Sequence, residues 1–429
     1  MNTNSNYTLS PDSAGIIYPY VATDDWCSVY RIESKLKKPL DLPALKSAVE
    51  EMRKEYPYYF SKIARYKRHF VLVPGGDKNV MDENIYPFCR PFDIENEPLS
   101  RVIYDSETVA VEMFHVLADG RGGLNFFKEL MKKYSRISNG GKIADLNSEH
   151  FVTGKYDDIY RKMTLAGGKN VSRVVSGAYQ FKKQPETGLE AFCIDADVSS
   201  LKSAAKKRGA SITEYLCALQ MKAIFDSEKT GNKPVRISVP VDIRKFAFTQ
   251  TDRNGSLYTL IGAKKKDARD IDSLIQNVKV QFDSTVTRDN MLNIAYTNVK
   301  QSDMAVFKAL PIGLKKFVLN IGYTVFGENQ FTATLTNPGI IDVGAEISDV
   351  VSDVYFILGK QKTKPVNIAV STFNSRARIM VSSDYRCSSF TNWLMAYLKS
   401  DGVNFKSYRI TNNNTKPKNE NKITREKAS

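Results

Sequence analysis

The chain has 429 residues, 42% of them hydrophobic and 11% aromatic, and 62 basic against 47 acidic residues give it a net charge of +15. This composition excludes a disordered or fibrous chain and supplies enough apolar side chains for two domains or lobes. The positive charge is typical of nucleic-acid-binding proteins, but the basic residues are spread along the chain. No helix-turn-helix, zinc-finger or RNP-type signature accompanies them. We therefore expect no nucleic-acid partner.

Five cysteines are scattered along the chain and none stands in C-x-x-C spacing, so they indicate neither a disulfide framework nor a zinc site. The first residues are polar and lack the charged and apolar segments of a secretory signal. The longest apolar stretch, residues 309–326, is interrupted by Lys315 and Lys316, so we expect no transmembrane segment. Together these features predict a cytoplasmic protein without a bound metal.

The first part of the chain, residues 1–170, is expected to form an N-terminal lobe. Residues 1–25 contain Pro11 and Pro19, which favour an extended lead-in. Asp41 followed by Pro43 predicts the start of a helix that ends at Tyr56-Pro57. Alternating apolar residues predict strands over residues 26–36, 58–64, 68–73 and 98–102.

A further strand is expected over residues 108–114, where Val109, Val111 and Met113 fall on one face. Apolar residues at helical spacing from Leu124 to Tyr134 then predict an amphipathic helix of about three turns. His115 follows the strand directly, in the loop that leads to this helix. Such loops often carry the reactive groups of a rigid scaffold.

His115 has the chemistry of a general base, because an imidazole can take a proton from a hydroxyl, thiol or amine near neutral pH. Asp119 could hold the loop through an ion pair, and Gly120 would permit a tight turn that a Cβ forbids. The spacing alone fits equally well an ordinary loop histidine beside an Asp-Gly turn. His69 and His150 stand in basic or polar segments and are expected to have surface roles.

Residues 171–410 are expected to form a C-terminal lobe, after a polar, glycine-rich connection. Ser211 and Glu214 form a capping box at the start of a strong helix. The tail, residues 411–429, is basic and has too few apolar residues to form a core, so we expect it to be disordered. Strands are predicted over residues 191–194, 235–241, 331–339, 354–358, 366–370 and 377–382, and a last helix over 390–399.

The spacing His115-x-x-x-Asp119-Gly120 resembles the HxxxDG motif of the chloramphenicol acetyltransferase-like superfamily, which includes peptide condensation domains, plant acyltransferases and bacterial alcohol acetyltransferases. Many members have a second histidine where this chain has Phe114, so the motif is most similar to that of the alcohol acetyltransferase branch. The resemblance implies an α/β, two-lobed fold of mixed sheets flanked by helices. It also implies a tunnel between the lobes with His115 at its middle.

Two later segments resemble the same family. Arg244 follows a Pro-Val-Asp-Ile run like that of the family arginine that pairs with the motif aspartate; a surface arginine after a strand is the alternative. Thr336 and Asn337 stand at a strand end similar to one that faces the family's reaction centre. The resemblance implies that they donate to an oxyanion, whereas a plain strand followed by a Pro-Gly turn is the alternative.

The resemblance implies an acyltransferase that moves an acetyl or other short acyl group from acyl-CoA to the hydroxyl of a small alcohol, with His115 as general base. Acyl-CoA would be a cosubstrate, and no cofactor would be bound permanently. Two alternatives stay open. One is a condensation enzyme fed by a carrier-protein thioester, and the other is a non-catalytic member whose cleft only binds a ligand.

Overall fold

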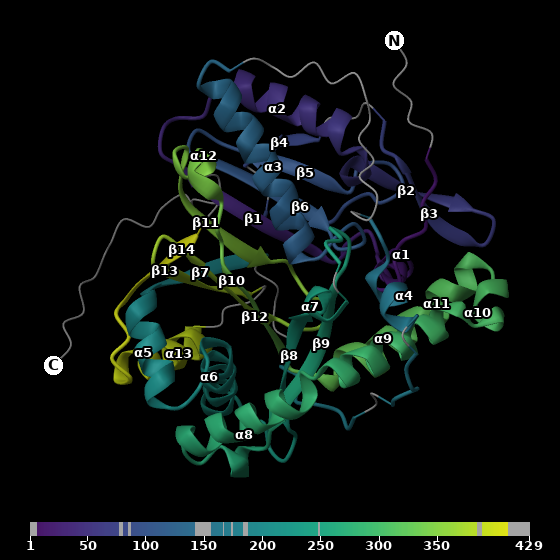
Figure 1. Cartoon of the computed structure of the whole chain (residues 1–429). Coiled ribbons are helices and arrows are strands. Elements are labelled where there is room, and N and C mark those ends of the chain that lie inside the picture. The colour runs from purple at the N-terminus through teal and green to yellow at the C-terminus, as the bar shows by residue number, and fades with distance from the viewer. Residues whose placement is uncertain are drawn as a thin grey trace.

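The computed structural model describes residues 7–410 apart from 77–79, 85–86, 142–155, 166, 173–174, 183–187, 248 and 384–387. Its strands form a five-stranded sheet, a seven-stranded sheet and a two-stranded hairpin (Figure 1). Helices cover one face of each large sheet, which confirms the expected α/β, two-lobed architecture. The tail predicted to be disordered, residues 411–429, lies outside the described residues.

The strands are β1 (Val29–Leu36), β2 (Ser61–Tyr66), β3 (His69–Pro74), β4 (Met81–Glu83), β5 (Ser100–Tyr104), β6 (Thr108–Phe114), β7 (Glu190–Asp197), β8 (Val235–Asp242), β9 (Ser256–Ala263), β10 (Ala333–Ile340), β11 (Val351–Leu358), β12 (Val366–Phe373), β13 (Arg376–Ser383) and β14 (Phe405–Ile410). The α-helices are α1 (Tyr18–Val21), α2 (Leu42–Glu55), α3 (Gly120–Ser138), α4 (Ile159–Thr164), α5 (Val198–Lys207), α6 (Ile212–Ser227), α7 (Arg244–Ala247), α8 (Ile271–Thr285), α9 (Arg288–Asp303), α10 (Ala305–Ala309), α11 (Ile312–Gly322), α12 (Gly344–Ser348) and α13 (Ser388–Ser400). A π-helical turn, Tyr323–Gly327, continues α11.

The five-stranded sheet has the order β11-β1-β6-β5-β4, and α2 and α3 lie over it (Figure 1). β1 runs antiparallel to both neighbours, so Tyr30 is opposite Met113 of β6 and Leu358 of β11. The predicted strand over residues 108–114 is confirmed. The helix after it begins at Gly120 and has 19 residues, so it is longer than predicted, because the Asp119 side chain caps its first turn.

The seven-stranded sheet has the order β14-β7-β13-β12-β10-β8-β9, with β10 parallel to β8 and β12. The predicted capping box of Ser211 and Glu214 is present at the start of α6. Residues 256–303 form β9, α8 and α9, for which the sequence patterns indicated no element. The apolar periodicity of α9 is weak, whereas α8 has an apolar face formed by Leu274, Ile275 and Val278.

β11 shows that the lobes do not divide the chain at a single point. It comes from the part of the chain assigned to the C-terminal lobe, yet it is an edge strand of the five-stranded sheet. The next strand, β12, lies in the seven-stranded sheet beside it, so the two sheets meet where the chain passes from one to the other. A boundary near residue 170 therefore does not describe the placement of residues 351–358.

The expectation of an extended lead-in over residues 1–25 was wrong for residues 15–21. This segment forms a 3-10 turn, Gly15–Ile17, followed directly by the short helix α1. Pro19 lies in the first turn of α1, where a helix does not need the missing N–H. Tyr20 is buried, and its carbonyl oxygen accepts a hydrogen bond from Nδ2 of Asn320 in α11 at 3.1 Å. Residues 15–21 are thus packed into the fold.

Candidate active site

The loop that carries His115 is held in place by hydrogen bonds to its backbone. The His115 N–H donates to the carbonyl oxygen of Ser28 at 2.8 Å, which continues the pairing of β6 with β1. The hydroxyl of Tyr58 donates to the carbonyl oxygen of Leu117 at 2.7 Å, and that of Tyr30 to the carbonyl oxygen of Asp119 at 2.9 Å. Because both tyrosines are buried, the loop has a rigid frame.

Asp119 forms a buried ion pair with Arg244, as the resemblance implied. Nη2 of Arg244 lies 2.8 Å from Oδ1 of Asp119 and Nη1 lies 2.9 Å from Oδ2. The carboxylate also accepts from the Gly122 N–H, the Gly255 N–H and the Ser256 hydroxyl. Burial raises the pKa of Asp119, but the charge and hydrogen bonds of Arg244 outweigh this and lower it to about 2.

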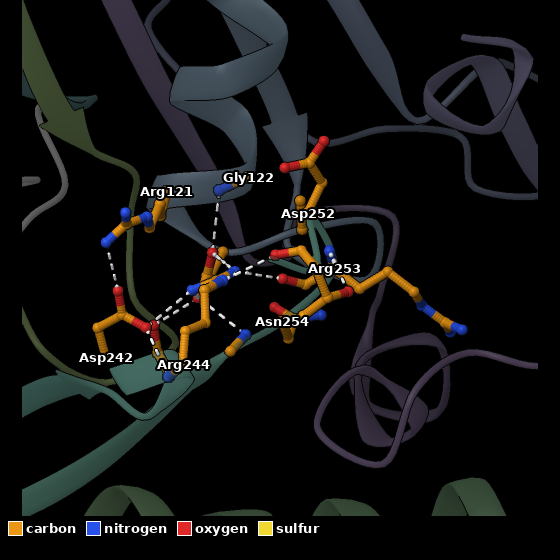
Figure 2. A network of polar contacts seen from close by, with 12 residues as sticks. Arg121, Gly122, Asp242, Arg244, Asp252, Arg253 and Asn254 are labelled. Atoms are coloured by element: carbon orange, nitrogen blue, oxygen red, sulfur yellow. Dashed lines mark hydrogen bonds and ion pairs between the residues drawn. The ribbon is translucent and has the colours of Figure 1, made fainter. Parts of the chain in front are cut away.

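Arg244 also stabilises the loop that precedes β9 through hydrogen bonds to its backbone. Its Nε donates to the carbonyl oxygen of Thr251 at 2.7 Å, and its Nη2 donates to that of Arg253 at 2.6 Å. Asp242 accepts from Nη1 at 3.1 Å and from Arg121 at 2.8 Å (Figure 2). Both oxygens of Asp119 accept hydrogen bonds from Arg244, so the ion pair links the loop after β6 to the segment after β8.

The tight-turn explanation for Gly120 was wrong, because its backbone lies outside the left-handed region. A Cβ on Gly120 would only contact Cε1 of Phe356 at 3.4 Å. The close approaches occur at the following glycines. A Cβ on Gly122 would lie 1.8 Å from the carbonyl oxygen of Asp252, and a Cβ on Gly123 would lie 2.3 Å from the hydroxyl of Tyr30. These two glycines let α3 pack against its neighbours.

The imidazole of His115 is bound at one nitrogen by Asn254. Nδ1 of His115 lies 2.9 Å from Oδ1 of Asn254, while Nδ2 of Asn254 donates to Oδ2 of Asp12 at 3.1 Å. A carboxylate accepts hydrogen bonds, so the Asn254 amide must turn its NH₂ toward Asp12 and its oxygen toward His115. Nδ1 therefore carries the proton. Nε2 makes no hydrogen bond to any residue that the structure describes and has the basic lone pair.

Asp12 was missed by the sequence reasoning, which placed it in the extended lead-in. It is 1% exposed and also accepts from the backbone N–H of Gly15 at 2.6 Å and of Asn254 at 3.0 Å. Burial raises the pKa of Asp12, and the guanidinium of Arg253, 3.4 Å away, partly offsets this. Asp12 and Asn254 are 242 residues apart. No local pattern could have predicted their contact.

His115 lines a cavity of about 970 Å³ between the two large sheets. Asp119, Gly120, Thr336 and Asn337 also contribute to its wall, so the structure brings together the residues singled out in the sequence. Arg244 lies behind Asp119 and is not part of the wall. Aromatic side chains make up much of the remaining lining, including Tyr18, Trp26, Tyr30, Tyr258, Tyr323 and Phe331.

Thr336 and Asn337 differ in how far their side chains are already engaged. Nδ2 of Asn337 donates to Oγ1 of Thr213 at 3.0 Å, and its Oδ1 accepts from the Gly339 N–H at 2.9 Å. The Thr336 hydroxyl makes no hydrogen bond to the described residues. β10 also does not end in a turn here but continues to Ile340, with a register shift between Thr336 and Gly339. Pro338 explains this shift, because it cannot donate to the strand ladder.

No family model and no curated protein matches this chain. Among solved structures, polyketide synthase associated protein 5 from Mycobacterium tuberculosis is similar over 91% of this chain and 97% of its own, with a TM-score of 0.63 and 12% identity. The trichothecene 15-O-acetyltransferase from Fusarium sporotrichioides is similar over 92% of this chain and 94% of its own, with a TM-score of 0.62 and 12% identity.

A third similar structure is the starter condensation domain of rhizomide synthetase, a mutant in complex with C8-CoA and Leu-SNAC. It covers 92% of this chain and 93% of its own, with a TM-score of 0.59 and 11% identity. These similarities extend over nearly the whole described chain. They show that it has the two-lobed chloramphenicol acetyltransferase-like fold of acyltransferases and condensation domains. Within the described residues, no helix combines the length and the apolar character needed to cross a membrane.

Proposed function

We propose that this chain is an acyltransferase that moves a short acyl group from acyl-CoA to the hydroxyl of a small alcohol, with His115 as the general base. One observation carries the proposal. His115 lines a large cavity between the lobes, and its Nδ1 is bound by Asn254. Nε2 is therefore the nitrogen left to act on a substrate in this cavity.

In the proposed reaction, His115 first accepts a proton from the acceptor hydroxyl and later donates it to the leaving thiolate. Nε2 of His115 takes the proton of the acceptor hydroxyl while the oxygen attacks the thioester carbonyl. The tetrahedral intermediate carries a negative oxygen, to which the Thr336 hydroxyl donates a hydrogen bond. When the intermediate collapses, the carbon–sulfur bond breaks and the imidazolium returns the proton to the thiolate of coenzyme A. The products are the ester and the free thiol.

The remaining residues of the motif are assigned supporting roles. Asp119 and Arg244 hold the loop and join the lobes, since their charges are already paired with each other. Arg121 and Lys128 line the same cavity and would attract the phosphates of coenzyme A, although Arg121 also pairs with Asp242. Similarity in fold to an O-acetyltransferase, and to a condensation domain solved with C8-CoA, supports acyl-CoA as a cosubstrate.

The test is thiol release from acetyl-CoA in the presence of a panel of alcohols, with wild type and His115→Ala. Release that depends on the alcohol and is lost in His115→Ala is the expected result. His69→Ala is the matched control, because His69 contacts Lys315 outside the cavity lining. Equal release by wild type and His115→Ala would remove His115 from the mechanism.

Two results would favour the alternatives. Transfer from a pantetheine thioester, but not from acetyl-CoA, would indicate a carrier-protein donor. Binding of acetyl-CoA by calorimetry, without transfer to any acceptor, would indicate a fold member that only binds its ligand.

A further inference from the structure

The outer face of α11 and of the π-helical turn after it carries an apolar stripe that the rest of the described chain leaves exposed. Its members recur at helical spacing, and their exposed fractions run from 45% to 64%. The stripe consists of Leu314, Phe317, Val318, Ile321 and Val325. Soluble proteins seldom expose a contiguous apolar face of this kind, and such faces commonly mark interaction sites.

The β2–β3 hairpin and α11 lie at the edge of the molecule (Figure 1) and are bonded to each other. Nζ of Lys315, which is buried, donates to the carbonyl oxygen of Arg68 at 2.7 Å. Nη1 of Arg68 donates to the carbonyl oxygen of Ala309 at 2.7 Å. Tyr66 at the hairpin tip and Met304 before α10 add exposed apolar surface, 54% and 55% respectively. We call this combined surface, residues 61–70 and 304–325, the α11 ridge.

The α11 ridge is uniformly basic. Its two segments contain seven lysines and arginines, of which Lys315 is buried and the other six are at least partly exposed, and no aspartate or glutamate. Residues outside the ridge neutralise only part of this charge, since Glu95 pairs with Arg65 and Asp303 pairs with Lys308. Nζ of Lys67 lies 5.3 Å from the ring of Tyr66, so positive charge and exposed aromatic surface adjoin at the hairpin tip.

The inner face of the same helix forms part of the cavity wall. Leu319, Gly322 and Tyr323 line the cavity that contains His115. Apolar side chains of this helix therefore face both the cavity and the outer surface. Only the helix itself separates the cavity from the exposed stripe.

We propose that the α11 ridge docks on an anionic lipid surface, with the apolar stripe in the headgroup and acyl boundary and the basic residues against the headgroups. An apolar stripe with a basic rim is the pattern of helices that lie in a membrane interface. A protein partner would need an apolar groove of matching shape, because the stripe has no polar side chain with which a partner could form specific hydrogen bonds. The lipid surface needs no such complement. Docking would place the cavity wall next to the membrane.

Vesicle co-sedimentation tests the proposal without requiring catalysis. Wild type should bind vesicles of phosphatidylcholine with phosphatidylserine, bind pure phosphatidylcholine vesicles weakly, and dissociate as salt is raised. Phe317→Asp should weaken binding about tenfold, because it removes a large apolar group from the boundary. Lys316→Glu should weaken binding to the anionic vesicles only. His115→Ala should bind as wild type, which separates docking from the proposed function.

Val280→Asp is the matched control, because Val280 is 66% exposed on α8, away from the ridge (Figure 1). It should bind as wild type. Equal binding of Phe317→Asp and wild type, each folded by circular dichroism, would overturn the proposal. A second result would also overturn it: wild type binds no vesicles but is a dimer in sedimentation velocity, and Phe317→Asp is a monomer. The stripe would then pack against a second copy of the chain.

Discussion

The amide of Asn254 lies between His115 and Asp12: its Oδ1 is 2.9 Å from Nδ1 of His115, and its Nδ2 is 3.1 Å from Oδ2 of Asp12. This arrangement selects the tautomer with the basic lone pair on Nε2. Replacing Asn254 with alanine should lower kcat about 10- to 100-fold with little change in KM, because the base loses its fixed orientation. Steady-state kinetics across pH would measure this.

Asn298→Ala is the control for that experiment, since Asn298 lines the cavity. It should change KM at most. Asp12→Asn should also lower kcat, because its amide can present an NH₂ where Asn254 needs an acceptor. Unchanged kcat in Asn254→Ala would show that the imidazole is oriented in another way.

The Asp119–Arg244 pair should be essential for stability. Arg244→Ala leaves a buried carboxylate without its partner and should cost about 3–5 kcal/mol in the free energy of unfolding. Urea titration would measure the loss. Arg121→Ala is the contrasting control, because Arg121 is 59% exposed and its pair with Asp242 should contribute less than about 1 kcal/mol. Equal losses in the two variants would contradict this assignment.

Acid should weaken the fold through Asp119. Its pKa is about 2 in the folded chain and 3.8 ordinarily, so the unfolded chain binds the proton more readily. The stabilisation is therefore complete above about pH 4 and is lost as pH falls toward 2, by about 2 kcal/mol in total. Urea titrations at pH 6, 4 and 3 should show about half of this loss in wild type and a smaller one in Asp119→Asn. Parallel pH profiles in the two proteins would exclude Asp119 as the source.

Thr336→Val should reduce kcat about 100-fold at nearly constant KM, because a donor to the oxyanion acts only in the transition state. Asn337→Ala should instead lower the melting temperature, since its side chain already bonds Thr213 and the Gly339 N–H. Steady-state kinetics and thermal melts on both variants would separate these roles. A larger loss of kcat in Asn337→Ala than in Thr336→Val would reverse the assignment.

Gly122→Ala should destabilise the chain by about 1–3 kcal/mol, because a Cβ there meets the backbone of Asp252 at 1.8 Å. Gly120→Ala provides the comparison. Its Cβ would make an ordinary contact with Phe356, so its melting temperature should stay close to that of wild type. If Gly120→Ala proved the less stable variant, the packing of α3 against residues 252–255 would need another explanation.

Short-range patterns were enough to predict much of this fold. Strand β6, the cap of α2 by Asp41 and the capping box at Ser211 all depend on residues within a few positions of one another. The same holds for the His115-x-x-x-Asp119 spacing, which local geometry confines to one loop. Residues 256–303 were not predicted. The weak apolar pattern of α9 explains its omission, but β9 alternates buried and half-buried residues as a strand should, so its pattern was there to be found.

The sequence by itself determined which loop presents His115 and which aspartate, Asp119, stands beside it. Only the tertiary structure decided that Asp12, Asn254 and His115 form one chain of hydrogen bonds, that β11 joins the first sheet, and that α11 has an exposed apolar face. The physical reason is separation along the chain. Asp119 meets Arg244 across 125 residues and Asp12 meets Asn254 across 242, so only the packing of the two sheets brings them into contact.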